Sequence, residues 1–265
     1  MAFQALQVLP DVYHIQDCMG VCMTLLVGKD RALLVDTGYG LENVREMAAS
    51  ITALPVTVLL THAHHDHALG ARWFDRVLLF PQDQPLFPVF TGTFRRQRVL
   101  ESAKDKGLSV QEDDYLQFVM PPILDAREET MDLGSLHARI ICCPGHTPGS
   151  AVVYVPEREL LLTGDDWNPC TWLFFREALP AQQYRANVRK LLDLPFRNVL
   201  CSHQPTLFER DMMEAFLNHL TDETLSLAKR VPTGDAEGVR TAEAALPHGQ
   251  VFVFDRDKFD AYREA

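Results

Sequence analysis

Four histidines and an aspartate lie within six residues of one another in the segment THAHHDHALG, residues 61–70. The segment follows the apolar run 56–60, which predicts a buried strand. Imidazole and carboxylate groups are the preferred protein ligands of zinc and of neighbouring first-row metals. The sequence therefore predicts a metal site at the end of this strand. For the segment taken alone, a solvated histidine-rich surface or a polar helix N-terminus is the alternative.

The spacing within the segment divides its side chains between two directions. His62 and His64 alternate, so in an extended segment their side chains share a face. Asp66 and His67 follow where a helix is expected to begin, and the turned backbone lets them point to a second position. His65 falls on the opposite face by this parity. We expect it to point away from the metal.

Three later segments place metal-ligand residues directly after apolar runs. His146 lies in PGHTPGS, Asp165 in TGDD and His203 in the pair SH. A single histidine at a strand end is usually structural, but ligands at successive strand ends are what a two-metal site on a rigid sheet requires. The predicted metal ligands are His62, His64, Asp66, His67, His146, Asp165 and His203.

Hydrophobic periodicity and turn residues predict a mixed fold. Strands at 12–15, 22–27 and 32–35 are expected to pair antiparallel. A helix at 41–53 and the strand at 56–60 follow, and this alternation predicts parallel pairing. The other expected elements are strands at 77–80, 137–142, 151–155, 159–163, 198–201 and 250–254 and helices at 68–74, 94–106, 111–119, 182–194 and 207–230.

The length of 265 residues and the hydrophobic content of 47% allow one large domain, which we expect to cover residues 1–265. Prolines bracket the segment at about 81–127, which is predicted to be a helical insertion. Residues after about 231 are predicted to be a C-terminal extension, with the best linker candidate at 234–238. The basic side chains of the predicted insertion form either a solvated helix face or an anion-binding lid: Arg95, Arg96, Arg98, Lys104 and Lys106.

The net charge of −11 argues against a nucleic acid or an anionic membrane as partner, since phosphate binding draws on clustered Lys and Arg. The N-terminal segment has no basic and apolar signal pattern, and no apolar run approaches about 18 residues. We therefore expect a cytoplasmic protein with a small-molecule substrate, and a homo-oligomer is left open. The six cysteines are expected to be free thiols.

Taken together, the motifs VDTG with Asp36, THAHHDH, GHTPGS, TGD and the late SH resemble those of the metallo-β-lactamase fold superfamily, over about residues 12–205. The resemblance implies an α/β fold, a four-layer αββα sandwich of two mixed β-sheets flanked by helices, with the metals at one sheet edge. It implies a first metal held by His62, His64 and His146, a second held by Asp66, His67 and His203, and Asp165 bridging both.

The position of Asp165 points to one branch of this superfamily. True lactamases with a cysteine ligand have it at this position, so the ligand set is similar to that of glyoxalase II. Glyoxalase II, however, carries its helical glutathione-binding region late in the chain. Here the predicted insertion at 81–127 precedes His146, which argues against glutathione thioesters as substrates.

Two divalent ions about 3.5–4 Å apart can share a water and lower its pKa enough to give hydroxide at neutral pH. We therefore expect a binuclear metal-dependent hydrolase that cleaves a small ester, thioester or lactone with a metal-bridging hydroxide. Zinc is the first choice of metal, with manganese and iron as alternatives. Asp66 is the predicted catalytic residue, which orients the hydroxide or passes on its proton. Asp36 is predicted to hydrogen-bond a ligand histidine or to tie its loop together.

An aromatic segment, DWNPCTWLFF at 166–175, leaves the expected metal edge. It predicts an apolar substrate pocket formed by Trp167, Asn168 and Trp172. Because aromatic side chains bury large areas wherever they lie, packing of this segment under the predicted insertion is the alternative.

Three other functions are compatible with parts of this pattern. A phosphodiesterase or nuclease of the same fold is disfavoured by the net charge of −11. A mononuclear iron dioxygenase that acts on a persulfide would use nearly the same ligands. A non-catalytic scaffold is disfavoured by the intact ligand set. Metal content and a substrate panel distinguish these functions.

Overall fold

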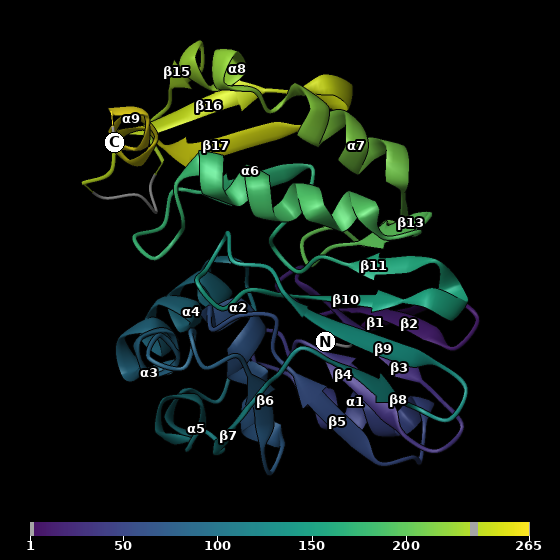
Figure 1. The fold of residues 1–265 in the computed structure, drawn as a ribbon. Coiled ribbons are helices and arrows are strands. Elements are labelled where there is room, and N and C mark those ends of the chain that lie inside the picture. Colours follow the sequence, from purple (N-terminus) through teal and green to yellow (C-terminus); the bar gives the residue numbers. More distant parts are fainter. Residues whose placement is uncertain (1–2, 234–237, 265) are drawn as a thin grey trace.

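The computed structural model describes residues 3–233 and 238–264. Apart from Gly238, the linker candidate at 234–238 lies outside the described residues. Figure 1 shows two stacked sheets with helices on their outer faces and a third, smaller sheet beyond one helical layer. The predicted αββα sandwich is confirmed, and the third sheet is an addition that the sequence did not predict.

The first sheet has seven strands and confirms the predicted antiparallel opening. Strands β1 to β4 pair antiparallel, and β4 to β7 pair parallel. The parallel half places the ends of β4 and β5 at the same sheet edge. In order, the strands are β1 (Gln4–Leu9), β2 (Val12–Gln16), β3 (Cys22–Val27), β4 (Ala32–Val35), β5 (Val56–Leu59), β6 (Val77–Leu79) and β7 (Ile123–Asp125).

The second sheet has six strands and packs face to face with the first. Leu33 and Leu59 of the first sheet share one buried core with Val153 and Leu162 of the second. Strands β11 and β13 pair parallel, so their carboxyl ends also lie at one edge. In spatial order, the strands are β14 (Phe208–Glu209), β13 (Asn198–Leu200), β11 (Leu160–Leu162), β10 (Ala151–Val155), β9 (His137–Cys142) and β8 (Glu129–Asp132).

Helices cover the outer faces of both sheets. In α1, Val44 and Ala48 pack on the first sheet, and α6 and α7 cover the second. No helix within residues 3–233 and 238–264 is long and apolar enough to cross a membrane. The α-helices are α1 (Val44–Ile51), α2 (His65–Ala68), α3 (Phe87–Thr91), α4 (Thr93–Asp105), α5 (Glu112–Gln117), α6 (Ala181–Arg189), α7 (Arg210–His219), α8 (Asp222–Ser226) and α9 (Arg256–Glu264). Short 3-10 helices lie at Leu69–Trp73, Pro156–Arg158, Lys190–Asp193 and Pro247–Gly249.

The segment at 81–127 contains three helices and then a strand. Its helices α3, α4 and α5 lie together on one side of the molecule in Figure 1, close to α2. The segment ends with β7, which pairs with β6 and forms the edge of the seven-stranded sheet. The segment is therefore helical, as predicted, but also extends the first sheet.

The third sheet joins two segments that lie far apart in the sequence. Its strands, in spatial order, are β12 (Cys170–Leu173), β17 (Val251–Asp255), β16 (Thr241–Ala245) and β15 (Lys229–Arg230). Phe252 of β17 packs against Tyr184 of α6 and Phe216 of α7, with ring centroids 5.3 and 5.9 Å apart. The helical layer thus lies between the second and third sheets, and β12 is held by a strand about eighty residues further along the chain.

The prediction of one continuous helix at 207–230 is wrong. The structure has β14, α7, α8 and β15 over this range. Leu220 ends α7 with a non-helical backbone (φ −78°, ψ 67°), and the Thr221 side chain then caps α8 by accepting from Thr224 N. A threonine in this capping position starts a new helix.

Candidate metal centre

The seven predicted ligands come together where the ends of strands from both sheets meet. The cluster at 62–67 follows β5 of the first sheet, and the other ligands follow β9, β11 and β13 of the second. Three overlapping groups have ligand atoms within 4.8 Å of one another. The groups are His62, His64 and His146; His62, His67 and Asp165; and Asp66, His67 and His203.

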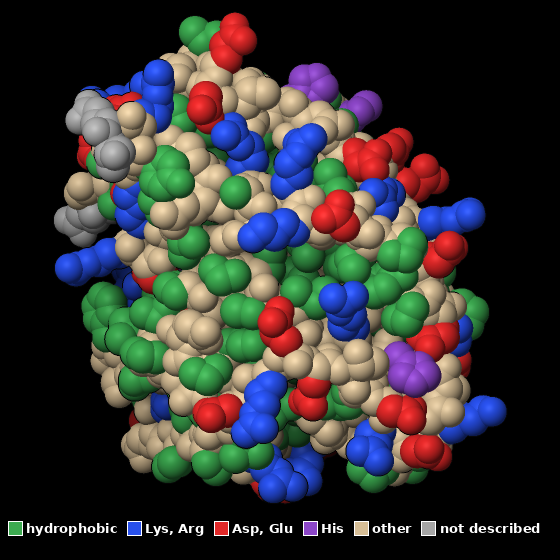
Figure 2. Space-filling model, viewed as in Figure 1, with side chains coloured by type: hydrophobic (Ala, Val, Ile, Leu, Met, Phe, Trp, Pro, Cys, Tyr) green, Lys and Arg blue, Asp and Glu red, His purple; other side chains and the backbone are tan. Residues whose placement is uncertain are grey.

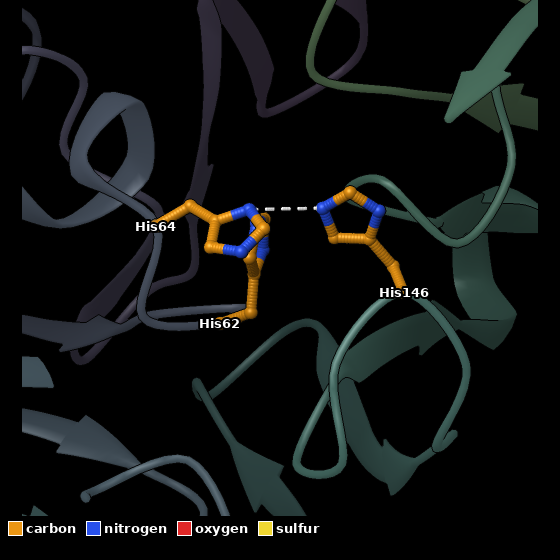
Figure 3. Close-up of side chains that lie close together, drawn as sticks. All are labelled: His62, His64 and His146. Atoms are coloured by element: carbon orange, nitrogen blue, oxygen red, sulfur yellow. Dashed lines mark hydrogen bonds between the residues drawn. The ribbon is translucent and has the colours of Figure 1, made fainter. Parts of the chain in front are cut away.

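The first and third groups form two ends of one cluster. At the first end, His146 Nε2 lies 3.0 Å from His64 Nδ1 (Figure 3). At the other end, Asp66 Oδ2 lies 3.5 Å from His67 Nε2 and 3.6 Å from His203 Nε2.

Asp165 lies between the two ends. Its Oδ2 atom is 3.0 Å from His203 Nε2, 3.5 Å from His67 Nε2 and 3.6 Å from His146 Nε2. One carboxylate therefore reaches nitrogens of both end groups.

Outer hydrogen bonds fix which nitrogen of three rings carries the hydrogen. His67 Nδ1 donates to Asp36 Oδ2 at 2.8 Å, and His146 Nδ1 donates to the carbonyl oxygen of Trp172 at 2.8 Å. His64 Nε2 donates to Glu177 Oε1 at 2.6 Å. These oxygens accept hydrogen bonds only, so the neutral form of each ring keeps its lone pair on the inner nitrogen.

His62 is oriented in the same way through a hydroxyl group. Thr61 Oγ1 donates to Asp36 Oδ2 at 2.8 Å and therefore accepts from His62 Nδ1 at 3.0 Å. The lone pair of His62 then lies on Nε2, which faces the cluster. Asp36 thus orients one ligand directly and a second through Thr61.

The inner atoms fit a divalent metal ion. Among the described residues, His62 Nε2, His67 Nε2 and Asp165 Oδ1 are buried without a hydrogen-bond partner. The lone pairs of His64 Nδ1 and His146 Nε2 also face each other at 3.0 Å. Nitrogens bound to one tetrahedral zinc lie about 3.3 Å apart, given bonds of about 2.0–2.1 Å. A shared cation would satisfy both the unpartnered atoms and the facing lone pairs.

The electrostatics of the cluster agree with this fit. Burial and the neighbouring His64 ring lower the pKa of His146 to about 4, so its ring is neutral at pH 7. Burial raises the pKa of Asp165, but His203 and His67 outweigh it and hold the pKa well below its usual range. Neutral imidazole and ionised carboxylate are the forms that bind metals.

His67 has the opposite shift. Burial lowers the pKa of its ring, but the Asp165 and Asp66 carboxylates outweigh this effect and hold the pKa well above its ordinary value. This end of the cluster therefore favours a positive charge, which a proton or a metal cation supplies.

Asp36 is held in a strained backbone conformation at the end of β4. Its φ is +66°, a region that aspartate tolerates better than most residues. The side chain is buried and also accepts from Thr61 N at 2.7 Å. The structure thus places Asp36 in a hydrogen bond with His67, one of the predicted ligands.

His65 belongs to none of the three groups. Its ring stacks on Phe90 of α3, with centroids 6.5 Å apart and planes at 8°. Phe90 also packs on His64 at 4.3 Å, and Phe175 packs on His64 and His146 at 4.9 and 5.3 Å. Two phenylalanines therefore cover the outer side of the first group.

Sequence reasoning missed Glu177 and did not select Phe90. Glu177 lies in the turn between β12 and α6, and its hydrogen bond to His64 spans 113 residues. Burial raises its pKa, but the hydrogen bond with His64 outweighs burial and the net pKa is lowered. A lone glutamate beside no recognisable motif gives no sequence signal for this role.

The structure places two of the three predicted pocket residues in the interior. Trp167 is 0% exposed and packs edge-on against Phe208 with centroids 5.5 Å apart. Asn168 is also buried and accepts from Cys170 N at 2.8 Å, which closes a local turn. Burial thus keeps both side chains off the exposed surface where a substrate would first make contact. Trp172 is 39% exposed and stays a candidate for substrate contact.

Most of the predicted basic patch is used within the protein. Arg96 is buried and donates to backbone carbonyls, including Thr91 O at 2.7 Å. Arg98 pairs with Glu101, Lys104 pairs with Glu112, and Lys106 donates to Met19 O. Arg95 has no carboxylate partner among residues 3–233 and 238–264, and its guanidinium lies 5.0 Å from the Phe90 ring centroid.

Two mixed sheets with a buried histidine and aspartate cluster at their common edge define a metal-binding protein of the αββα class. A family model described as Metallo-beta-lactamase superfamily matches residues 17–203. The chain belongs to the metallo-β-lactamase superfamily. Its class is that of the metal-dependent hydrolases, which confirms this part of the sequence prediction.

Named relatives are similar at low identity. The acyl-coenzyme A thioesterase MBLAC2 of Bos taurus is 24% identical over 195 residues, which cover 66% of this chain and 68% of that protein. The probable metallo-hydrolase YqgX of Bacillus subtilis (strain 168) is 24% identical over 140 residues, 53% of this chain and 63% of that protein.

A solved structure supports the fold. The protein TTHA1623, solved in a di-iron-bound form, aligns with a TM-score of 0.55 at 22% identity. The alignment covers 81% of this chain and 97% of that chain. At this identity the similarity shows the fold alone.

Proposed function

We propose that this protein is a binuclear metal-dependent hydrolase that cleaves thioesters between an apolar acyl group and an anionic thiol carrier. The observation that carries this proposal is the set of inward lone pairs and unpartnered buried atoms at the shared sheet edge. The same site would also be able to hydrolyse esters and lactones, because they present a similar carbonyl group.

Two ions are supported by the division of the cluster. His62, His64 and His146 form one group and Asp66, His67 and His203 form another, while Asp165 reaches both. Nitrogen and carboxylate ligands without a thiolate suit zinc first, and manganese or iron as alternatives. A protein of the same fold, TTHA1623, was solved with two irons, so this fold accommodates a metal pair.

The surroundings of the first group suit an apolar acyl chain. Phe90 and Phe175 pack on its histidines, and Phe94 and Trp172 are 69% and 39% exposed. Figure 2 shows hydrophobic side chains gathered over the region of α3 and α4. An apolar substrate gains binding energy there by removing these side chains from water.

The unpaired Arg95 suits an anionic part of the substrate. It lies over Phe90, which separates it from His64 by one aromatic ring. A guanidinium binds phosphate or carboxylate oxygens in a bidentate manner. The relative from Bos taurus is named an acyl-coenzyme A thioesterase, and coenzyme A thioesters combine an acyl chain with phosphates. Its name therefore supports the substrate class that these side chains favour.

The residues of the cluster would divide the catalytic work. When bound, two divalent ions lower the pKa of a water held between them and polarise the substrate carbonyl. With the ions bound, the Asp66 carboxylate, which lies beside His67 and His203, would orient this water or pass on its proton. Phe90 and Phe175 exclude bulk water from the first group, which strengthens electrostatic interactions there.

Metal content and a substrate panel test this function. We expect two metal ions per chain by mass spectrometry, and zinc-dependent hydrolysis of a long-chain acyl-coenzyme A. The panel also includes a neutral ester of the same acid, a lactone, a β-lactam, a phosphodiester and a persulfide. A single iron with oxygen consumption on the persulfide would overturn the proposal, as would metal-independent hydrolysis.

A phosphodiester as the preferred substrate would contradict the proposal in another way. Figure 2 shows Lys and Arg interspersed with Asp and Glu on the face that it displays. Phosphate backbones bind extended basic surfaces. We therefore expect weak phosphodiester cleavage at most.

Replacing Arg95 tests recognition of the anionic carrier. Arg95→Gln is expected to raise KM for an acyl-coenzyme A roughly 10-fold or more, since a hydrogen bond to a charged group contributes about 1.5–3 kcal/mol. The kcat should change little, because Arg95 contacts no member of the cluster. Steady-state kinetics on the coenzyme A thioester and on a neutral thioester of the same acid measure this effect.

The matched control is Arg98→Gln, three residues along the same helix. Arg98 is exposed and paired with Glu101, so its replacement should leave both kinetic constants unchanged. If Arg95→Gln loses as much activity on the neutral thioester as on the coenzyme A thioester, then Arg95 does not bind the anionic part of the substrate.

A further inference from the structure

A short turn at residues 175–178 lies next to the group formed by His62, His64 and His146, and a lysine from α9 holds this turn by hydrogen bonds. Lys258 Nζ donates to the carbonyl oxygens of Phe175, Arg176 and Ala178 at 2.9, 2.9 and 2.7 Å. Within this turn, Glu177 is the residue whose side chain accepts from His64 Nε2. The ammonium group therefore holds the backbone on both sides of Glu177.

The chemistry of an ammonium group suits this position. An ammonium has three donors and no acceptor, and all three donors of Lys258 are used by the turn. Three carbonyl oxygens that converge on one point repel one another, and a positive charge relieves this repulsion. Replacing Lys258 would therefore let the turn open without any change in the sequence of the turn itself.

Both sides of the connection are anchored. On the α9 side, Phe259 is 0% exposed and packs on Phe254, and its carbonyl accepts from Gln182 Nε2 at 3.0 Å. On the metal side, Leu179 N donates to Gly145 O at 2.9 Å, next to His146. The turn is thus held between a fixed helix and the loop that carries a predicted ligand.

We propose that Lys258 is a positioning residue for the metal centre. It acts through Glu177 to fix the orientation of His64. The proposal rests on the metal site of the proposed function. Lys258 lies outside residues 17–203, the range matched by the superfamily model. The connection is therefore supplied by a part of the chain beyond that match.

The position of Glu177 distinguishes this role from simple stabilisation of a turn. Its carboxylate fixes the hydrogen on His64 Nε2 and leaves Nδ1 free for the ion. Outer partners of ligand histidines commonly change metal affinity by about 10–100-fold when they are removed. A lysine that only stabilised the fold would change the melting temperature without a specific change in metal affinity.

The test is zinc affinity, measured by competition with a chromophoric chelator on the full chain. Lys258→Met keeps an unbranched side chain, one atom shorter, and removes all three donors. We expect it to weaken zinc binding at the group that contains His64 by about 10-fold. Glu177→Ala, which removes the acceptor directly, is expected to weaken it by at least as much.

The double variant shows whether the two residues act in series. If Lys258 acts through Glu177, then Lys258→Met has no further effect on zinc affinity in the Glu177→Ala background. Equal effects of Lys258→Met in both backgrounds would overturn the proposal. An unchanged zinc affinity in Lys258→Met would overturn it as well.

Arg240→Gln is the matched control for a loosened α9. Arg240 pairs with Asp257 and Asp260 of α9, and among the residues that the structure describes no hydrogen bond or ion pair joins its side chain to the turn. Its zinc affinity should equal that of the wild type, even if its melting temperature falls. A loss of affinity equal to that of Lys258→Met would overturn the proposal in favour of general loosening.

The wild-type titration separates this proposal from the proposed function. No zinc binding by the wild type would refute the metal site and the role of Lys258 together. Zinc binding without thioester hydrolysis would refute the proposed substrate alone, and the comparison of Lys258→Met with the wild type would still decide its role.

Discussion

Asp165→Asn is expected to lower kcat/KM by roughly 10³-fold, since losing several kcal/mol of transition-state stabilisation has this effect. The physical reason is the central position of the carboxylate, whose Oδ2 lies 3.0 Å from His203 Nε2 and 3.6 Å from His146 Nε2. An amide has no negative charge and one oxygen fewer. We also expect metal content to fall below that of the wild type, measured by mass spectrometry alongside the kinetics.

Asp75→Asn is the control for this substitution. The Asp75 side chain is 89% exposed, and Arg45 is its one ion-pair partner among residues 3–233 and 238–264, so its loss should change neither activity nor metal content. Circular dichroism establishes that both variants are folded. Wild-type metal content and activity in Asp165→Asn would contradict a bridging role for this carboxylate.

Asp36→Ala is expected to lower the free energy of unfolding by at least about 3 kcal/mol. It removes the acceptor for Thr61 N, the Thr61 hydroxyl and His67 Nδ1, all of which are buried. Each unsatisfied buried donor costs about 1–3 kcal/mol, and alanine at positive φ adds about 1–2 kcal/mol. Urea unfolding of the chelator-treated protein measures this loss without a contribution from metal.

Asp36→Asn is the informative partner of that variant. Asparagine tolerates the φ of +66° and keeps one acceptor oxygen, so most of the stability should remain. Metal affinity should fall by about 10–100-fold, because the charged partner of His67 is lost. Equal stability of the alanine variant and the wild type would show that Asp36 does not hold this edge together.

The position of the cluster could be predicted because ligands and strands are both local signals. The apolar run before THAHHDH predicts β5, and similar runs precede His146, Asp165 and His203. Parallel pairing then brings strand ends to one edge, as β11 and β13 show. The division into two groups followed from alternation along the segment at 62–67 and from the resemblance to a known family.

The contacts that support the cluster could not be predicted in this way. Glu177 reaches His64 across 113 residues, and Lys258 reaches the same turn across about eighty. Neither residue lies in a motif. Pairing of β12 with β17 is equally distant, and a four- or five-residue strand carries no mark of its partner.

Two errors have a common physical origin. Trp167 was assigned to a pocket because an aromatic residue follows the metal edge, but burial of its large surface in the core decides its position. The single helix predicted at 207–230 is interrupted at Leu220, where the backbone leaves the helical conformation, and at Thr221, whose side chain caps α8. Periodicity alone detects neither the direction of a side chain after a turn nor a short interruption between two helices.

Parallel pairing of β12 with β17 has a consequence for the order of events during synthesis. The carbonyl of Trp172, which orients His146, belongs to β12, and β12 completes its sheet only with residues 251–255. A nascent chain that has left the ribosome as far as His203 therefore carries every predicted ligand but lacks β17, the strand that pairs with β12 beside His146. We therefore expect stable metal binding only after release of the later segment, and a chain arrested before β17 should hold less metal than the full chain by mass spectrometry.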